Sequence, residues 1–534
     1  MEERAVTGGG AQSAHGRRLA LSTIFFSAAT AVSRVVGLLR EVLAAKYFGV
    51  QGAGINAFTA AFQVPNLIRA LVADAALSSA FVPVFSELLV KGQRARAWRV
   101  ASTLFWLMLL GLGALTALFM LAAPLVMGIF GMEGHQQQLA ITLARILFPI
   151  VVLLGLSGIV VGILNSYEHF SVPALTPVFW NLAIIAGLVI GVPMTDSTTN
   201  QLYIYAGAIL VGTAIQFLLP LPWLAGLDGR LRPVVDWRDP AVRRVFVLMG
   251  PVALGLGLIN FNVLMGTVFA SNLIDKNLAP RAIDSAFRIY MLPQGIFSVA
   301  IATVLFPTIS RFAAQKDWGA YRDSVSLGMR QIAFTLVPAS AISIVLADPI
   351  VRLLYQRGKF TPHQTTVVAA CLAAYSVGLA FNGFMLMLNR GFFALQRPWT
   401  PTVIALGNLV LNIALYAVFF PVGPWGIPLA ISLANIAGTA ALLVAMRRRL
   451  GRIDLRAMTS SFVRIAIASL VYAAVSYAIW RPLDHALGRS LGGQILSLGT
   501  ALAVGLAAYL VSARLLAVRE LETLLALRGR RRAS

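Results

Sequence analysis

Charged side chains lie inside an apolar stretch near the start of the chain, where a guanidinium group is costly to bury. The segment SRVVGLLRE (33–41) contains Arg34, Arg40 and Glu41, and later apolar stretches contain Arg69 and Arg288. An arginine near the centre of a membrane helix costs roughly 2.5–3.5 kcal/mol. Arginine also suits planar, bidentate recognition of phosphate. The four arginines are therefore expected to line an internal, hydrated cavity that binds an anion.

The acidic residues expected in this cavity are too few to neutralise four arginines. Glu41 and Asp74 lie in the same helices, and Asn66 is a polar neighbour one turn before Arg69. The surplus positive charge favours a phosphate or diphosphate ligand over a cation.

Glycine and proline mark where the helices that carry these arginines are expected to bend, at Gly37, Pro65, Pro293 and Gly295. Three other arginines lie near the ends of apolar segments, where we expect their side chains to extend toward the lipid headgroups. They are Arg145, Arg352 and Arg464.

The composition indicates an all-α polytopic membrane protein. The 534 residues are 58% hydrophobic and 12% charged, with a mean hydropathy of +0.81; a soluble protein carries about 25% charged residues. At about 20 apolar residues per span, the sequence predicts about fourteen transmembrane helices. Cys371 is the sole cysteine, which excludes a disulfide framework. The net charge of +23 is attributed to basic loops that orient the chain, not to a nucleic-acid partner.

The chain is expected to comprise two lobes of six helices, followed by two further helices. FVPVFSEL (81–88) resembles LFPTISRF (305–312), and LNSYEHFSVPALTP (164–177) resembles LNRGFFALQRPWTP (388–401); both pairs are 224 residues apart. Six spans separate the copies, so the lobes are related by a pseudo-two-fold axis along the membrane normal. The expected segments are a tail at 1–18, lobes at 19–224 and 225–446, two helices at 447–516 and a basic tail at 517–534. Most lysines and arginines lie on the side that carries both termini, which predicts that both are cytoplasmic.

Several ordered motifs resemble the MurJ (MviN) family of lipid II flippases, within the MATE-like exporter superfamily. They are SRVVGLLRE, NAFTAAFQVPNLIRALVADAALSSAFVPVFSE (56–87), FRIYMLPQGIFSVAIATVLFP (287–307) and YQRGKFTP (355–362).

The resemblance implies transport of undecaprenyl-pyrophosphate-linked disaccharide-pentapeptide, lipid II, from the inner to the outer leaflet of the bacterial cytoplasmic membrane. It places Arg34, Arg40, Arg69 and Arg288 at the family's cavity arginines, and the last two helices at a groove for the polyprenyl tail. It implies alternating access, contact with membrane lipids and cell-wall synthesis proteins, and no enzymatic cofactor. Arg357 and Lys359 of the loop YQRGKFTP are expected to help close the outer face.

The sequence departs from the family pattern beside the eighth-span arginine. Some members have acids there, where this chain has Phe287 and Met291. Asn408 and Asn412 could supply two ligands of a sodium site, but the seventh span contains no carboxylate to complete it. The energy source stays open between sodium and the membrane potential.

Four other functions are compatible with parts of the pattern. A MATE-type cation or drug antiporter would need intramembrane acids, and a flippase for another polyprenyl-linked glycan would share the arginine cavity. A membrane enzyme acting on lipid phosphates would need a general base or a metal site, whereas all five histidines are expected in loops or the tail. A scaffold for cell-wall assembly would tolerate glutamine in place of the arginines.

Overall fold

The computed structural model of the chain describes residues 29–72, 75–169, 171–397, 399–451 and 455–521. The tail at 1–18, Asp74 and most of the tail at 517–534 lie outside the described residues. The described part is helical throughout and contains no β-strand. By packing, the chain divides into two compact units: unit 1 contains residues up to Phe48 and Gly52–Val268, and unit 2 contains Gly49–Gln51 and residues from Phe269 onward.

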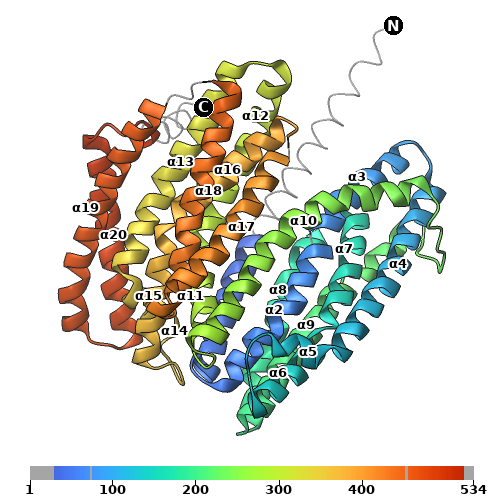
Figure 1. Ribbon diagram of the computed structural model, residues 1–534, viewed down its shortest axis with the longest axis horizontal. Coiled ribbons are helices and arrows are strands. Elements are labelled where there is room, and N and C mark those ends of the chain that lie inside the picture. Colours follow the sequence, from blue (N-terminus) through green and yellow to red (C-terminus); the bar gives the residue numbers. More distant parts are fainter. Residues whose placement is uncertain (1–28, 73–74, 170, 398, 452–454, 522–534) are drawn as a thin grey trace, which may run out of the picture. The chain divides into compact units, whose positions relative to one another are not determined.

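Unit 1 contains the helix described over 29–48 and nine numbered α-helices (Figure 1). These are α2 (Ala53–Val72), α3 (Ala75–Val90), α4 (Arg94–Leu121), α5 (Ala123–Gly128), α6 (Gly134–Leu147), α7 (Ile150–Ser166), α8 (Ser171–Ala186), α9 (Thr198–Leu218) and α10 (Pro240–Phe269), which belongs to unit 1 up to Val268. Close approach of α3 and α7 requires a glycine, because a Cβ on Gly162 would lie 2.7 Å from Phe81 Cδ1.

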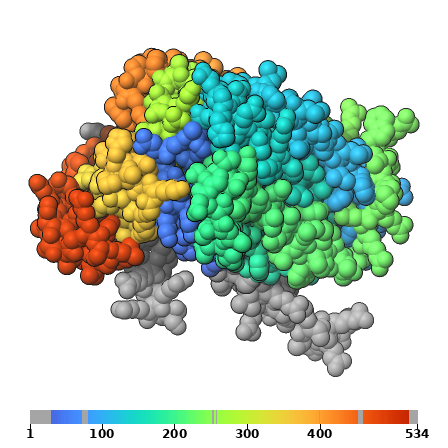
Figure 2. Space-filling view, turned by 90° about the horizontal axis from the view of Figure 1, so that it is seen from below, coloured from blue at the N-terminus to red at the C-terminus, as the bar shows by residue number. Residues whose placement is uncertain are grey.

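Unit 2 contains ten α-helices among the described residues. They are α11 (Ala279–Pro293), α12 (Val299–Gln315), α13 (Trp318–Val345), α14 (Ala347–Tyr355), α15 (Pro362–Val377), α16 (Leu379–Ala394), α17 (Trp399–Phe419), α18 (Gly426–Leu450), α19 (Leu455–Leu487) and α20 (Leu491–Leu515). The last two lie side by side (Figure 1), and α19 packs along α13. In Figure 2 the red C-terminal helices lie next to the amber part of the chain.

Most of the described chain lies in helical segments that can cross a membrane. Eleven continuous segments are long and apolar enough, and some of them join two of the helices above, as Gly134–Ser166 joins α6 and α7. A bent pair, Pro362–Val377 with Leu379–Ala394, makes a twelfth. Two of the fourteen predicted spans, 19–48 and 55–90, include residues outside the described part. The polytopic, all-helical class is confirmed; the count of fourteen stays a prediction.

The helix boundaries repeat at the offset found in the sequence. The helices α4 and α13 are each 28 residues long, and α13 begins 224 residues after α4. Two residues before each of these helices begins, the backbone adopts a left-handed conformation in both copies. Gly92 has φ +72° and Lys316 has φ +57°. Short helices, α5 and α14, then begin at corresponding positions. The internal repeat is therefore present in backbone conformation as well as in sequence, whereas the lobe boundary at residue 224 stays a prediction.

Candidate functional site

Arg40 is buried, paired with an acid and stacked on an aromatic ring of another helix. Its Nε and Nη2 atoms donate to Glu41 Oε1 at 3.2 and 2.5 Å, and its guanidinium carbon lies 4.6 Å from the Trp180 ring centre. Trp180 is oriented by its own hydrogen bond, in which Nε1 donates to Thr213 Oγ1 at 3.1 Å. In this structure Arg40 therefore joins the first helix to α8, with Glu41 as its counterion.

Arg34, six residues earlier on the same helix, has a different environment. Its side chain is exposed, and among the described residues it makes no hydrogen bond or ion pair. The helix continues through Gly37, where an added Cβ would lie 3.6 Å from Asn181 Oδ1. Asn181 also donates to Ser33 O at 3.4 Å. The glycine thus permits a close helix contact, while Arg34 is accessible to a ligand.

Arg69 is hydrogen-bonded to an asparagine one turn earlier on α2. Its Nε and Nη2 atoms donate to Asn66 Oδ1 at 3.2 and 3.0 Å, and Asn66 Nδ2 donates to Asn260 Oδ1 of α10 at 3.4 Å. These contacts orient the guanidinium and link α2 to α10. Pro65 is buried inside α2, which continues as a helix on both sides of it. Asn260 was not identified from the sequence, because no local pattern relates it to Asn66.

Arg288 shares a carboxylate with a second arginine on α11. Asp284 Oδ2 accepts from Arg288 Nε at 2.9 Å and from Arg281 Nη1 at 3.0 Å. Asp284 and Arg281 were not identified from the sequence, although the i, i+4 spacing of Asp284 and Arg288 is a recognised helical ion-pair signal. The expectation that Glu41 and Asp74 are the acids beside the arginines was therefore incomplete.

The two departures beside Arg288 have different surroundings. Phe287 belongs to an aromatic cluster, with its ring centre 5.8 Å from Tyr290 and 5.6 Å from Tyr375, and Met291 is exposed. After Pro293 the α-helix changes to a π-helical turn over Gln294–Ser298, which includes Gly295. The predicted irregularity at Pro293 and Gly295 is present in this form.

The loop with Arg357 and Lys359 connects α14 to α15. Arg357 Nη2 donates to Leu353 O at 2.7 Å, and Lys359 is exposed. Residues 49–51 pack in the same unit, where Val50 N donates to Gln364 Oε1 at 3.0 Å. Gly49 has φ +65°, and a Cβ there would lie 2.9 Å from Lys359 O. The turn after the first helix therefore needs glycine to fit against this loop.

Asn408 and Asn412, the residues expected to contribute to a sodium site, are linked by a hydrogen bond within α17. Asn412 is buried, and its Nδ2 donates to Asn408 O at 3.1 Å, while its Oδ1 has no hydrogen-bond partner among the described residues. The described residues contain no group of three or more His, Cys, Asp or Glu placed to hold a metal ion. This buried amide oxygen can supply one ligand to a cation, and a cation of this kind prefers several oxygens.

The segment that precedes α10 lies along α4. Arg232 N donates to Ser102 Oγ and Asp236 N to Thr103 Oγ1, each at 3.0 Å. The Tyr167 hydroxyl donates a hydrogen bond to Asp228. This hydrogen bond is the main cause that lowers the pKa of Asp228. Burial raises the pKa of Tyr167 to about 12. These contacts fix the segment to unit 1.

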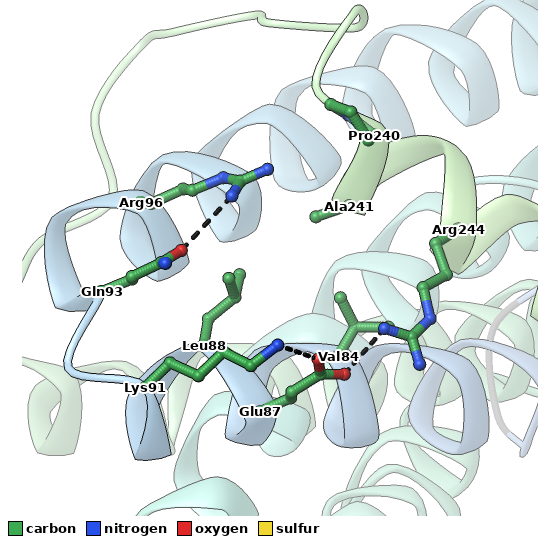
Figure 3. Close-up of a pocket in the computed structure, with 9 residues that line it drawn as sticks. All are labelled: Val84, Glu87, Leu88, Lys91, Gln93, Arg96, Pro240, Ala241 and Arg244. Carbon is green, nitrogen blue, oxygen red and sulfur yellow. Dashed lines mark hydrogen bonds and ion pairs between the residues drawn. The ribbon is translucent and has the colours of Figure 1, made fainter.

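Ion pairs attach the start of α10 to α3 and α4 around a cavity of 210 Å³ (Figure 3). Glu87 lies between Lys91 at 2.5 Å and Arg244 at 2.7 Å. Arg96 forms two hydrogen bonds to Asp239, at 3.1 and 3.0 Å, and these are the main cause that lowers the pKa of Asp239. Because the carboxylates already pair with these cations, we interpret the feature as a helix-fastening contact.

The structure thus gives three of the four predicted binding arginines partners of their own. Arg40 lies with Glu41 and Trp180, Arg69 with Asn66, and Arg288 with Asp284; Arg34 is exposed. The three arginines expected to lie near headgroups differ from one another. Arg145 and Arg464 are exposed and bond backbone carbonyls, but Arg352 is buried and paired with Asp484, so the expectation for Arg352 was wrong.

Comparisons with known proteins agree on one family. A family model described as lipid II flippase MurJ matches residues 44–487. The lipid II flippase MurJ of Burkholderia cenocepacia is 33% identical over 465 residues, which cover 84% of this chain and 87% of the relative. The probable lipid II flippase MurJ of Vibrio cholerae is 32% identical over 524 residues, which cover 94% of this chain and 97% of the relative.

Solved structures give the same result. A lipid II flippase MurJ in an inward closed conformation superposes with a TM-score of 0.76 at 25% identity, over 92% of this chain and 98% of that structure. An inward-facing multidrug resistance MATE transporter of the MOP superfamily has a TM-score of 0.68 at 17% identity, over 80% and 95% of the two chains. The second similarity shows a shared fold alone.

Proposed function

Because the chain belongs to the lipid II flippase MurJ family, we propose that it moves lipid II from the inner to the outer leaflet of the bacterial cytoplasmic membrane by alternating access, as a transporter and not as an enzyme. The membrane-spanning helices and the family match over residues 44–487 support this proposal. Both termini are proposed to be cytoplasmic, since most basic residues of the loops lie on that side.

The diphosphate of lipid II is proposed to bind the arginines within the spans. Arg34 is exposed, and Arg69 and Arg288 are half-buried and oriented by polar partners. These three are proposed as the first contacts. Arg40 is buried under Trp180 with Glu41 as counterion, so it must exchange Glu41 for phosphate before it contributes. The observation that carries the proposal is this retention of costly guanidinium groups within membrane helices.

Replacing Arg288 or Arg34 with alanine tests the proposal. Each variant should be present at normal levels in a bacterium depleted of its own flippase, yet fail to support growth, and lipid II should accumulate in the inner leaflet. Arg243→Ala, an exposed arginine near the start of α10, is the control and should support growth. Full growth with either Arg34→Ala or Arg288→Ala would contradict the assignment. Transport of another polyprenyl diphosphate glycan but not lipid II would identify the alternative substrate.

Energy coupling is proposed to use either sodium or the membrane potential. Asn412 Oδ1, which is buried and has no partner among the described residues, supports the first; the positive charge of the arginines supports the second. Transport that responds to sodium and loses this response in Asn412→Ala would favour sodium. Transport that follows an imposed potential at constant sodium would favour the potential.

A further inference from the structure

Arg281, Asp284 and Arg288 form a charged stripe along one face of α11. Their spacing of three and four residues places them one above another on the helix. The side chains become more exposed along the stripe, at 3% for Arg281, 17% for Asp284 and 30% for Arg288. The stripe therefore joins a fully buried cation to one that a ligand can reach.

A single oxygen atom serves both guanidinium groups. Asp284 Oδ2 accepts from Arg281 Nη1 at 3.0 Å and from Arg288 Nε at 2.9 Å. A buried arginine needs a counterion, since an uncompensated buried charge costs several kcal/mol. Asp284 supplies it, so its negative charge is divided between two positive ones. The stripe keeps a net charge of +1, and its most accessible member is Arg288.

The helix that carries the stripe is hydrogen-bonded to neighbouring helices. Tyr355 OH donates to Ser285 O at 3.4 Å, and Asn382 Nδ2 donates to Tyr290 OH at 2.7 Å. Both tyrosines are buried. The backbone that carries Arg281 and Asp284 is thus fixed to neighbouring helices, and the position of Arg288 follows from the position of Asp284.

We propose that Arg281 and Asp284 are positioning residues for the binding of a lipid diphosphate by Arg288. Asp284 holds Arg288 through its Nε edge and so limits the directions in which the guanidinium can point. Arg281 draws on the same carboxylate, which keeps Asp284 from cancelling the charge of Arg288. The inference rests on the proposed function and extends it to two residues that do not themselves contact the ligand.

The test measures the affinity of the full-length protein in nanodiscs for undecaprenyl diphosphate and for undecaprenyl monophosphate. Comparison of the two lipids distinguishes an effect on the charge available at Arg288 from an effect on the position of its guanidinium. Arg281→Met leaves Asp284 to neutralise Arg288, so diphosphate affinity should fall about tenfold, the value of one hydrogen bond to a charged group. The monophosphate, which carries less charge, should lose less. Arg281→Lys keeps the charge and should restore diphosphate binding.

The double variant Arg281→Met/Asp284→Asn removes both charges together and keeps the net charge of +1. Because Arg288 then lacks its anchor, affinity for both lipids should fall to a similar extent. If Arg281→Met yields too little folded protein, the double variant still tests the positioning role, because the double variant leaves no buried charge unpaired. Arg96→Met, which breaks an ion pair in unit 1, is the matched control and should bind both lipids normally.

Affinities within twofold of wild type for the double variant would overturn the positioning role. If Arg281→Met lowered the affinity for both lipids by the same factor, the charge-sharing role would be overturned. Failure of the proposed function gives a different result, because Arg288→Ala itself would then bind the diphosphate as the wild type does.

Discussion

Removing Asp484 should detach α19 from α14, because it would leave a buried arginine without a counterion. Arg352 Nη2 donates to Asp484 Oδ1, and the two side chains are 8% and 13% exposed. The Arg352 guanidinium also lies 5.8 Å from the Trp480 ring centre. One carboxylate therefore compensates a charge that water scarcely reaches.

The size of the effect follows from this burial. Breaking one partner of a buried pair costs about 3–5 kcal/mol, and the contact with Trp480, worth about 0.5–2 kcal/mol, does not replace the carboxylate. We therefore expect Asp484→Leu to lower the free energy of unfolding by about 3 kcal/mol or more. The double variant Arg352→Met/Asp484→Leu should recover most of this loss, because replacing both partners by apolar side chains is often neutral.

Reversible unfolding in mixed detergent micelles measures the free energy of unfolding of both variants. Hydrogen exchange over residues 455–487 shows whether α19 is the part that opens. Exchange should increase in α19 and α20 but not in unit 1. A loss below about 1 kcal/mol for Asp484→Leu, the range of an exposed pair, would refute the reasoning. A double variant as unstable as the single one would show that packing, and not the unpaired charge, sets the cost.

Three further predictions concern helix contacts. Trp180→Leu should lower unfolding stability by about 1–2 kcal/mol by removing the ring under Arg40, and Trp180→Phe should lower it less. Gly378→Ala should destabilise by about 1–3 kcal/mol, since its Cβ would lie 2.6 Å from Ser432 Cα; Gly407→Ala, with nothing within 4 Å, should be neutral or stabilising. The hydrogen bonds from Arg96 lower the pKa of Asp239, so the ion pair stabilises the fold at neutral pH and this stabilisation is lost when Asp239 is protonated. Hydrogen exchange over residues 227–239 should therefore rise below about pH 4. A rise centred near pH 6 would contradict this.

The sequence was sufficient for the class of protein, the family and the internal repeat. Hydropathy and the cost of charge within a bilayer depend on short stretches of sequence, so both can be evaluated without the tertiary structure. The 224-residue offset was likewise visible, and the boundaries of α4 and α13 confirm it. The family resemblance read from SRVVGLLRE and the other motifs is confirmed by the comparisons.

Local rules could also have identified Asp284, because its partner Arg288 lies one helical turn away. They could not have distinguished Arg34 from Arg40. Both are arginines in the same apolar helix, yet one is exposed and the other lies against Trp180.

Tertiary structure alone decided the partners that come from distant parts of the chain. Trp180 beneath Arg40, Asn260 beside Asn66 and Asp484 beside Arg352 have no sequence signal. Each contact depends on which helices pack together and on their rotation about their own axes. Hydropathy determines that a segment enters the membrane, but side-chain packing between helices determines what each buried charge meets there.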